Sequence, residues 1–394
     1  MKLYHLKTML LALIASALFI TGCVPAPRSS EELEDPVPVI QEPDKVRFIA
    51  AGDNLIHGVI YMQAARRAGY NGYDFDYPYE NTESYFDDFD VKFINQETLV
   101  NGAFEPSTYP QFSSPTALGD KVISMGFNVI GTSNNHSYDR YAKGVNASLE
   151  YWNSKDVVNV GFYTGDDDVD IKYLTVNNIK MAFLAYTYGT NGLSIDEANN
   201  PHIIHCDDFD IIERQVAKAK ENSDILIVSC HWGYEDTNET NDYQKKVADK
   251  LCELGVDVII GTHPHVIQTV EWHTNEVNDN RTLICYSLGN FISAQSRANN
   301  MLAGLFQFDI NKIYDEEGNY EITITDPYFV PTVTHYDYEW SNVRNYLLKD
   351  YSADMASKHG VRAYDGKFSM SYMENLVRKY IPEEFLLYEF KELQ

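Results

Sequence analysis

Residues 256–265 read VDVIIGTHPH, an apolar run that ends in two histidines around a proline. The apolar half predicts a buried β-strand, since it is a short run rich in β-branched residues. Pro264 lacks an N–H and has a fixed φ, so both histidines leave the strand end on rigid backbone. Held in this way, His263 and His265 are better suited to act as ligands than to fill a core.

Similar apolar runs alternate with helical patterns from Val46 onward. The strand-like runs cover residues 46–53, 91–97, 127–136, 157–163, 173–188, 224–233 and 256–265. The helical patterns cover residues 58–69, 114–126, 143–155, 209–221 and 241–255. This alternation predicts a layered α/β domain with a mostly parallel sheet. Asn177-Asn178 divides one strand-like run in two and predicts a hairpin.

The composition indicates a folded, acidic protein. Hydrophobic residues make up 44% of the 394 residues, which fits a globular chain rather than a disordered one. The formal net charge of −27 argues against a nucleic-acid partner, because phosphate binding needs a basic face. We expect the main domain to cover residues 46–335, with a β-rich part at 280–334. A mixed, largely helical extension is expected at 336–394.

The first residues predict export and lipid attachment. Residues 1–22 carry lysines before a short apolar stretch, which is typical of a cleaved signal peptide. The stretch leads into Ile-Thr-Gly-Cys, which resembles a bacterial lipobox with Cys23 as the lipidated residue. An ordinary signal peptide with a chance cysteine is the alternative. Residues 23–45, rich in proline and acidic side chains, predict a disordered tether. We therefore expect a lipid-anchored protein outside the cytoplasmic membrane.

The remaining cysteines form no paired motif. They are Cys206, Cys230, Cys252 and Cys285, and each flanks an apolar segment. Buried thiols are expected, although an exported chain permits disulfides.

Polar side chains follow the apolar runs at six places. They are Asp53 with His57, Asn95 with Glu97, Asn135 with His136 and Asp139, His231 with Glu235, His263 with His265, and Ser287 with Asn290. The carboxyl ends of parallel strands meet at one edge of a sheet, where α/β proteins bind ligands. Taken singly, each residue has a structural explanation, such as a helix cap at Asp53 or a turn at Asn135. A single shared site explains all six places together, so we infer such a site.

The residue types indicate the chemistry of this site. Carboxylate, amide oxygen and imidazole together suit divalent Mn, Fe or Zn, and the absence of cysteine argues against a thiolate site. The potential ligands are too many for one ion. They fit two ions about 3.5–4 Å apart, bridged by a carboxylate, which together activate water for a displacement. A neighbouring histidine can then protonate the leaving group.

As an ordered set, the motifs GD, NxE, NNH, HWGxE, GxHPHV and SLGNF resemble the CapA proteins of bacterial poly-γ-glutamate capsule synthesis. The resemblance spans roughly residues 46–295. That family is similar to the calcineurin-like metallophosphoesterases. The resemblance therefore implies a four-layered α/β/β/α sandwich, here followed by the mixed C-terminal extension.

The resemblance also implies a role for each site residue. Asp53 and His265 would hold a first ion, and Glu97 would bridge to a second. The second ion would be held by Asn135, His231 and His263, and His136 would be the acid beside the substrate. The remaining residues would contact substrate or support the ligands; they are His57, Asn95, Asp139, Glu235, Ser287 and Asn290.

One spacing departs from the phosphoesterase pattern. Phosphoesterases place aspartate and histidine two residues apart in their first motif, whereas Asp53 and His57 are four apart. On a strand-to-helix turn His57 can reach either the ion or the substrate. Both a one-ion and a two-ion site therefore stay open.

We expect a surface lipoprotein that serves poly-γ-glutamate production beside a membrane-bound ligase and its accessory membrane subunits. Its metal site would process, release or guide the polymer chain. Two alternatives remain. One is a metal-dependent hydrolase of phosphate esters or amide bonds unrelated to capsule, and the other is a non-catalytic scaffold.

Overall fold

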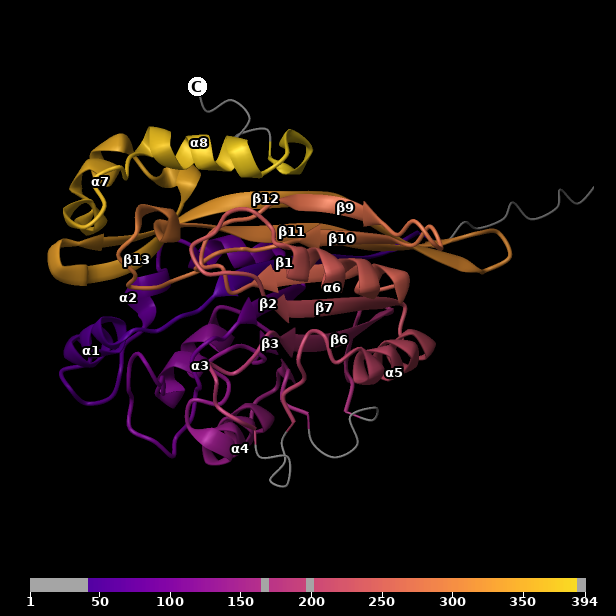
Figure 1. The fold of residues 1–394 in the computed structure, drawn as a ribbon, viewed down its shortest axis with the longest axis horizontal. Helices are drawn as coiled ribbons and strands as arrows, with labels where there is room; N and C mark the ends of the chain where they lie inside the picture. Colours follow the sequence, from indigo (N-terminus) through magenta and orange to yellow (C-terminus); the bar gives the residue numbers. More distant parts are fainter. Residues whose placement is uncertain (1–41, 164–169, 196–201, 388–394) are drawn as a thin grey trace, which may run out of the picture. The chain divides into compact units, whose positions relative to one another are not determined.

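Two β-sheets carry the fold in the computed structural model of the chain, which describes residues 42–163, 170–195 and 202–387 (Figure 1). The described residues belong to one unit, Ile40–Gln394. The predicted leader at 1–22, Cys23 and residues 23–41 of the tether lie outside the described residues. None of the helices in the described part of the chain combines the length and the apolar character that a membrane span requires.

The larger sheet has seven strands in the order β13-β12-β11-β1-β2-β3-β4. They are β1 (Asp44–Asp53), β2 (Val91–Asn95), β3 (Val129–Gly131), β4 (Val158–Val160), β11 (Leu302–Tyr314), β12 (Tyr320–Asp337) and β13 (Ser341–Leu347). Strands β1 to β4 are parallel, whereas β11, β12 and β13 add antiparallel pairs on the other side of β1.

The smaller sheet has six strands in the order β5-β6-β7-β8-β10-β9. They are β5 (Lys172–Val176), β6 (Ile179–Thr187), β7 (Ile225–His231), β8 (Val258–Thr262), β9 (Val270–Thr274) and β10 (Arg281–Cys285). The four central strands are parallel, and β5 and β9 are antiparallel edges. Asn177 and Asn178 turn β5 into β6 with φ of 47° and 58°, which confirms the predicted hairpin.

Eight α-helices accompany the sheets in the described residues. They are α1 (Gly58–Arg67), α2 (Asp76–Tyr79), α3 (Thr116–Ser124), α4 (Tyr141–Asn153), α5 (Phe209–Glu221), α6 (Asp242–Glu253), α7 (Ala353–Lys358) and α8 (Met370–Tyr380). The five predicted helical patterns correspond to α1, α3, α4, α5 and α6.

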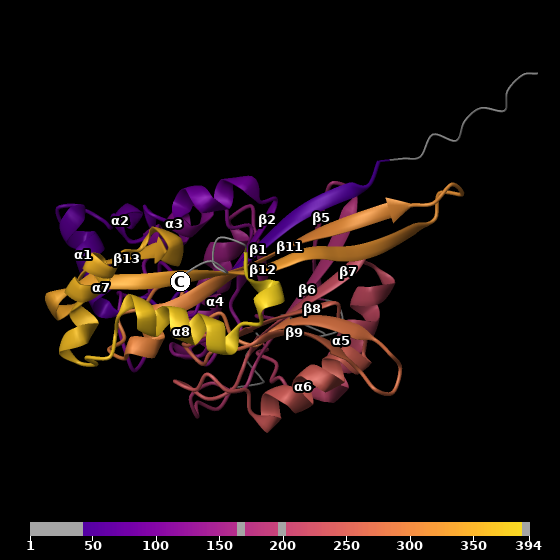
Figure 2. The same ribbon diagram turned by 90° about the horizontal axis from the view of Figure 1, so that it is seen from above.

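The alternation of side chains along β7 shows how the layers stack. Ile225 and Ile227 belong to the core shared with the seven-stranded sheet, whereas Leu226 and Val228 pack in a second core with α5 and α6. Successive side chains of a strand point to opposite faces, so one face of the smaller sheet meets the larger sheet and the other meets helices. Figure 2 shows α5 and α6 on the side of β6 and β7 away from β1 and β11.

Helices cover the larger sheet as well. α1 and α3 connect its parallel strands and bury apolar side chains such as Ile60 and Leu118 in the sheet core. The order helix, sheet, sheet, helix confirms the expected α/β/β/α sandwich. The C-terminal segment returns to β12, where Leu386 bridges to Phe329 and Val377 of α8 is buried.

The four cysteines at 206, 230, 252 and 285 are buried free thiols, as predicted. Cys206 and Cys230 lie in the core between the smaller sheet and its helices, and Cys285 lies in the core shared with the larger sheet. The thiol of Cys252 in α6 contacts the carbonyls of His273 and Asn280.

Candidate metal centre

The ends of strands from both sheets supply the site. β1 ends at Asp53, β2 at Asn95 and β7 at His231, and the segment with His263 and His265 follows β8 directly. The backbone N–H of His263 donates to Oδ2 of Asp53 at 3.3 Å, so the two sheets meet at this point. The structure thus brings together residues that the sequence places more than half the chain apart.

Asp53 is fully buried and receives polar contacts on both carboxylate oxygens. The amide of Asn95 donates to Oδ1 at 2.7 Å, and Nδ1 of His265 lies 3.1 Å from Oδ2. With its Nδ1–H directed at Asp53, His265 would leave Nε2 free as a ligand atom, which is the usual arrangement of a carboxylate-oriented metal histidine.

Glu97 gives the strongest indication of a cation site. Its side chain is fully buried, and neither carboxylate oxygen has a hydrogen-bond partner among the residues described. Nε2 of His231 and Nε2 of His265 each lie 3.8 Å from Oε1 of Glu97. Two donors at this separation fit one ion bound at about 2.0–2.2 Å from each.

The protonation preferences of these groups have clear causes. Burial, together with the nearby charge of Asp53, raises the pKa of Glu97 well above its usual range. Burial opposes the charged form of His265, but Glu97 and Asp53 outweigh it and raise its pKa to about 10. Without an ion, a proton on His265 therefore offsets the buried negative charge.

His231 and His263 behave differently. Burial lowers the pKa of each well below its usual range, and neighbouring histidines add to the effect. Both rings are thus neutral at pH 7, which is the form that binds metal. Nε2 of His231 lies 3.0 Å from Oδ1 of Asn135, and its Nδ1 lies 2.9 Å from the hydroxyl of Thr262. Nδ1 of His263 is buried without a hydrogen-bond partner among the described residues.

The backbone around Pro264 is strained. His263 and His265 have φ of 98° and 60°, a region that residues other than glycine seldom adopt. Such strain persists only where the surrounding structure enforces it, and it is concentrated at functional sites. The bond from the His263 amide to Asp53 is one contact that enforces it here.

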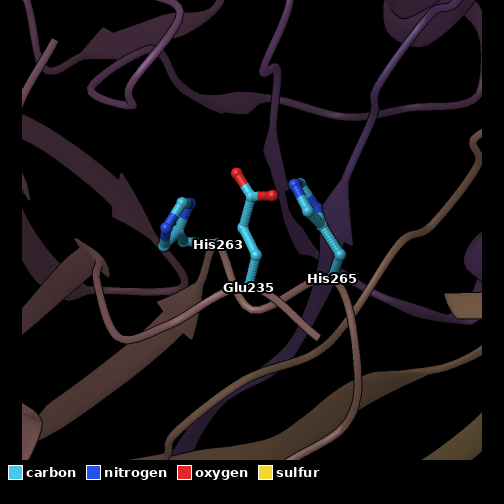
Figure 3. Close-up of side chains that lie close together, drawn as sticks. All are labelled: Glu235, His263 and His265. Carbon is cyan, nitrogen blue, oxygen red and sulfur yellow. The ribbon is translucent and has the colours of Figure 1, made fainter. Parts of the chain in front are cut away.

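Glu235 lies between two of the predicted ligands (Figure 3). Three possible ligand atoms lie within 4.8 Å of one another, one each from Glu235, His263 and His265. Asp53, Glu97 and His265 form a second such group, so His265 is common to both. The sequence predicted for Glu235 only a supporting or substrate-contacting role.

His136 forms a pair with Asp139 beside these groups. Nδ1 of His136 lies 2.8 Å from Oδ2 of Asp139, and the same oxygen accepts the backbone N–H of Phe112 at 2.6 Å. The Phe112 ring packs edge-on against His136 at 4.7 Å. The Asn135 amide donates to Oδ1 of Asn191 at 3.3 Å, and the Asn191 amide nitrogen lies 3.4 Å from Nδ1 of His136. His136 is therefore held in a fixed orientation next to Asn135.

Three predicted residues occupy supporting positions. The backbone N–H of Ala294 donates to Nδ1 of His57 at 3.2 Å, and neither donor group found in the described residues includes His57. The Ser287 hydroxyl donates to the carbonyl of Val266 at 2.7 Å. The Asn290 amide lies 3.4 Å from the carbonyl of His265. Ser287 and Asn290 thus brace the backbone of the histidine segment.

Two neighbours of the site were not predicted from the sequence. The Tyr188 ring packs on His263 at 4.4 Å between ring centroids, and Thr262 holds Nδ1 of His231. Tyr188 follows the last residue of β6, so the strand-end rule that found the other residues would also have found it.

The donor set fits a divalent metal. It combines buried carboxylates, an amide oxygen and neutral imidazoles, and two of its members, Glu97 and His263, have buried donor atoms with no partner in the described residues. Buried polar atoms without a partner are uncommon in native proteins, and their occurrence on two members of one donor set favours a bound ion here.

A family model described as "Bacterial capsule synthesis protein PGA_cap" matches residues 47–295 of the chain. This segment contains every residue of the centre described above. Its C-terminal limit falls after the loop with Ser287 and Asn290.

Two curated proteins are similar in sequence. The "PGA biosynthesis protein CapA" of Bacillus subtilis (strain 168) is 32% identical over 209 residues, which is 52% of this chain and 53% of that protein. The "Capsule biosynthesis protein CapA" of Bacillus anthracis is 27% identical over 260 residues, which is 61% of this chain and 59% of that protein. The chain thus spans little more than half the length of these relatives.

Among solved structures, the NAD nucleotidase (NadN) of Haemophilus influenzae covers 86% of this chain and 60% of its own, at 12% identity and a TM-score of 0.40.

Proposed function

This chain belongs to the family of bacterial capsule synthesis proteins, PGA_cap, and we propose that it serves poly-γ-glutamate production at the cell surface through a divalent-metal centre. The observation that carries the metal part of the proposal is Glu97. A buried carboxylate without hydrogen bonds, flanked by two imidazole nitrogens at 3.8 Å, is costly unless a cation occupies the space between them.

In this proposal some residues bind the metal and one residue transfers a proton. Asp53, Glu97 and His265 would hold one ion, and Asn135, His231 and His263 would hold a second, with Mn, Zn or Fe as the metals that this donor set favours. A bound ion would supply Lewis acidity and an activated water. His136, oriented by Asp139, would donate a proton to a leaving group.

The net charge limits how a polyanion approaches. At −27 the protein repels a chain of γ-linked glutamates over most of its surface. Cations at the centre would reverse the sign locally, which favours contact of the polymer with this site alone. Such a site suits processing, release or guidance of one chain at a time, not storage of polymer.

We also propose that the protein lies outside the cytoplasmic membrane. The N-terminal leader and the Cys23 lipobox support a lipid anchor, which would hold the centre near the membrane-bound ligase and its accessory subunits. The polymer chain and these membrane subunits are the proposed partners.

A specific observation favours a second function. The His136–Asp139 pair beside a metal donor set is also what a hydrolase of phosphate esters or other amide bonds requires. Purified protein loaded with Mn or Zn should be assayed on γ-glutamyl peptides and on phosphodiesters, with Glu97→Ala as the metal-binding control.

Metal-dependent cleavage of γ-glutamyl peptides supports the capsule role, and cleavage of phosphodiesters alone supports the second function. If the loaded protein cleaves neither, yet its gene and that of Glu97→Ala both restore polymer in a deletion strain, the protein is a scaffold. A bound ion should also raise the melting temperature, since binding at a hundredfold excess over Kd adds about 2.7 kcal/mol of stability.

A further inference from the structure

We infer that Glu235 is a metal ligand that closes the centre on its solvent side, an assignment that rests on the metal centre proposed above. Its carboxylate points between His263 and His265 (Figure 3), and the donor atoms of the three residues lie within 4.8 Å of one another. A modest contraction would bring the Glu235 carboxylate within reach of an ion held by either histidine, because ligand bonds of about 2.0–2.2 Å place neighbouring donors of one ion 3–4 Å apart.

The position of Glu235 relative to the histidines is fixed by backbone contacts. The N–H of Asp236 donates to the carbonyl of Pro264 at 2.8 Å, so the residue after Glu235 is tied to the residue between the two ligands. On the other side, the N–H of Trp232 donates to the carbonyl of Thr262 at 3.1 Å. The loop that carries Glu235 therefore moves together with the histidine segment.

The loop conformation is also held from outside. Asp236 adopts φ of 63° and is clamped by the Asn300 amide at 2.8 Å and by Arg297 at 2.7 Å. Gly233 has φ of 93°, and a Cβ there would lie 2.8 Å from the Gln244 side chain. These contacts constrain the backbone on both sides of Glu235. A surface acid that only contacts solvent does not need such a constraint.

Two further observations favour a ligand over a solvated acid. Nδ1 of His263, a member of the same group, is buried with no hydrogen-bond partner in the described residues. In the second group of possible ligands, the buried carboxylates of Asp53 and Glu97 lie next to His265 on its buried side. Glu235 thus supplies a carboxylate on the exposed side of the histidines, where the strand-end residues cannot reach.

The test is direct metal binding to the full chain. Mn²⁺ alone and Zn²⁺ alone are titrated into chelator-treated wild type, Glu235→Gln and Glu239→Gln by calorimetry, with bound metal counted by elemental analysis. Glu239 is the matched control, because it is an exposed acid four residues away whose side chain pairs only with Lys379, at 3.6 Å, among the described residues. Glu235→Gln should bind at least about tenfold more weakly, and Glu239→Gln should match wild type.

Equal affinity of Glu235→Gln and wild type overturns the inference while leaving the metal centre intact, even if hydrolysis is lost. In that case Glu235 acts on the substrate. A wild type that binds neither ion overturns both the inference and the metal part of the proposed function. Because Glu235 is exposed, circular dichroism should show Glu235→Gln folded like wild type, which keeps the comparison valid.

Discussion

The carboxylate of Asp53 lies 3.1 Å from Nδ1 of His265, and both side chains are buried. Asp53 ends a strand of the seven-stranded sheet, whereas His265 follows a strand of the six-stranded sheet. This contact therefore joins the two sheets and, at the same time, directs Nε2 of His265 toward Glu97.

Asp53→Asn should weaken Mn or Zn binding by at least about 10–100-fold, because it removes both a ligand charge and the group that orients His265. Calorimetric titration measures the loss. Asp354→Asn removes the same charge at an exposed helix position and should leave the affinity unchanged. Similar affinity in both variants would show that Asp53 is not part of the metal site.

Glu97→Gln should have opposite effects on metal and on stability. The variant loses the central carboxylate and should lose bound metal. In chelator it should be more stable than wild type by about 1–3 kcal/mol, because the raised pKa of Glu97 shows that the cost of burying its charge outweighs the attraction to His265. Urea unfolding in EDTA gives the free energies of unfolding. A variant less stable than wild type there would mean that Glu97 has favourable contacts in the metal-free protein.

His136→Ala should keep its metal and its stability but lose hydrolysis or polymer production by about 10²–10⁴-fold. His136 contacts Asp139 and Phe112 but belongs to neither metal donor group. Elemental analysis and activity are measured on the same preparation. Full activity in His136→Ala, with none in Glu97→Ala, would remove His136 as the acid.

The strand ends and their polar residues could be predicted because each is a local pattern. An apolar run followed by Asp53 or by His263 needs no distant partner to be recognised. The place of Glu235 could not be predicted in this way, because it depends on the bond between Asp236 and Pro264. Likewise, β13 can be identified as a strand only from its pairing with β12. The sequence of that region predicted only mixed structure.

Stability should fall as the pH drops from about 6.5 toward 3, in part through His359. Nδ1 of His359 accepts the N–H of Val361 at 2.9 Å, Nε2 lies 2.9 Å from the carbonyl of Thr334, and burial lowers its pKa to about 3. In this window the unfolded state binds the extra proton, so acid favours unfolding.

Near pH 5 the contribution lost from this one residue is about 2 kcal/mol. His359→Phe should be less stable at neutral pH but should show a smaller drop between about pH 7.5 and pH 5. Urea unfolding at both pH values measures the difference. If the free energy of unfolding falls as much in the variant as in wild type, the acid sensitivity belongs to other histidines.

Cys23→Ser should release the protein from the membrane or leave the leader uncleaved, because the lipobox cysteine is the proposed lipid-attachment residue. Fractionation followed by blotting compares the variant with wild type. Cys206→Ser, which alters a buried thiol, should not change the distribution. Wild type found entirely in the medium would contradict the lipoprotein assignment.

The position of β1 has a consequence for how the chain must be made. β1 lies between β2 and β11, and its pairing with β11 joins Asp44 to Lys312. During synthesis the first strand therefore emerges long before one of its two neighbours exists, and its open edge is a template for pairing with other chains. A fragment cut at residue 295, where the family match ends, would keep every proposed ligand yet lack β11, and it would aggregate rather than fold.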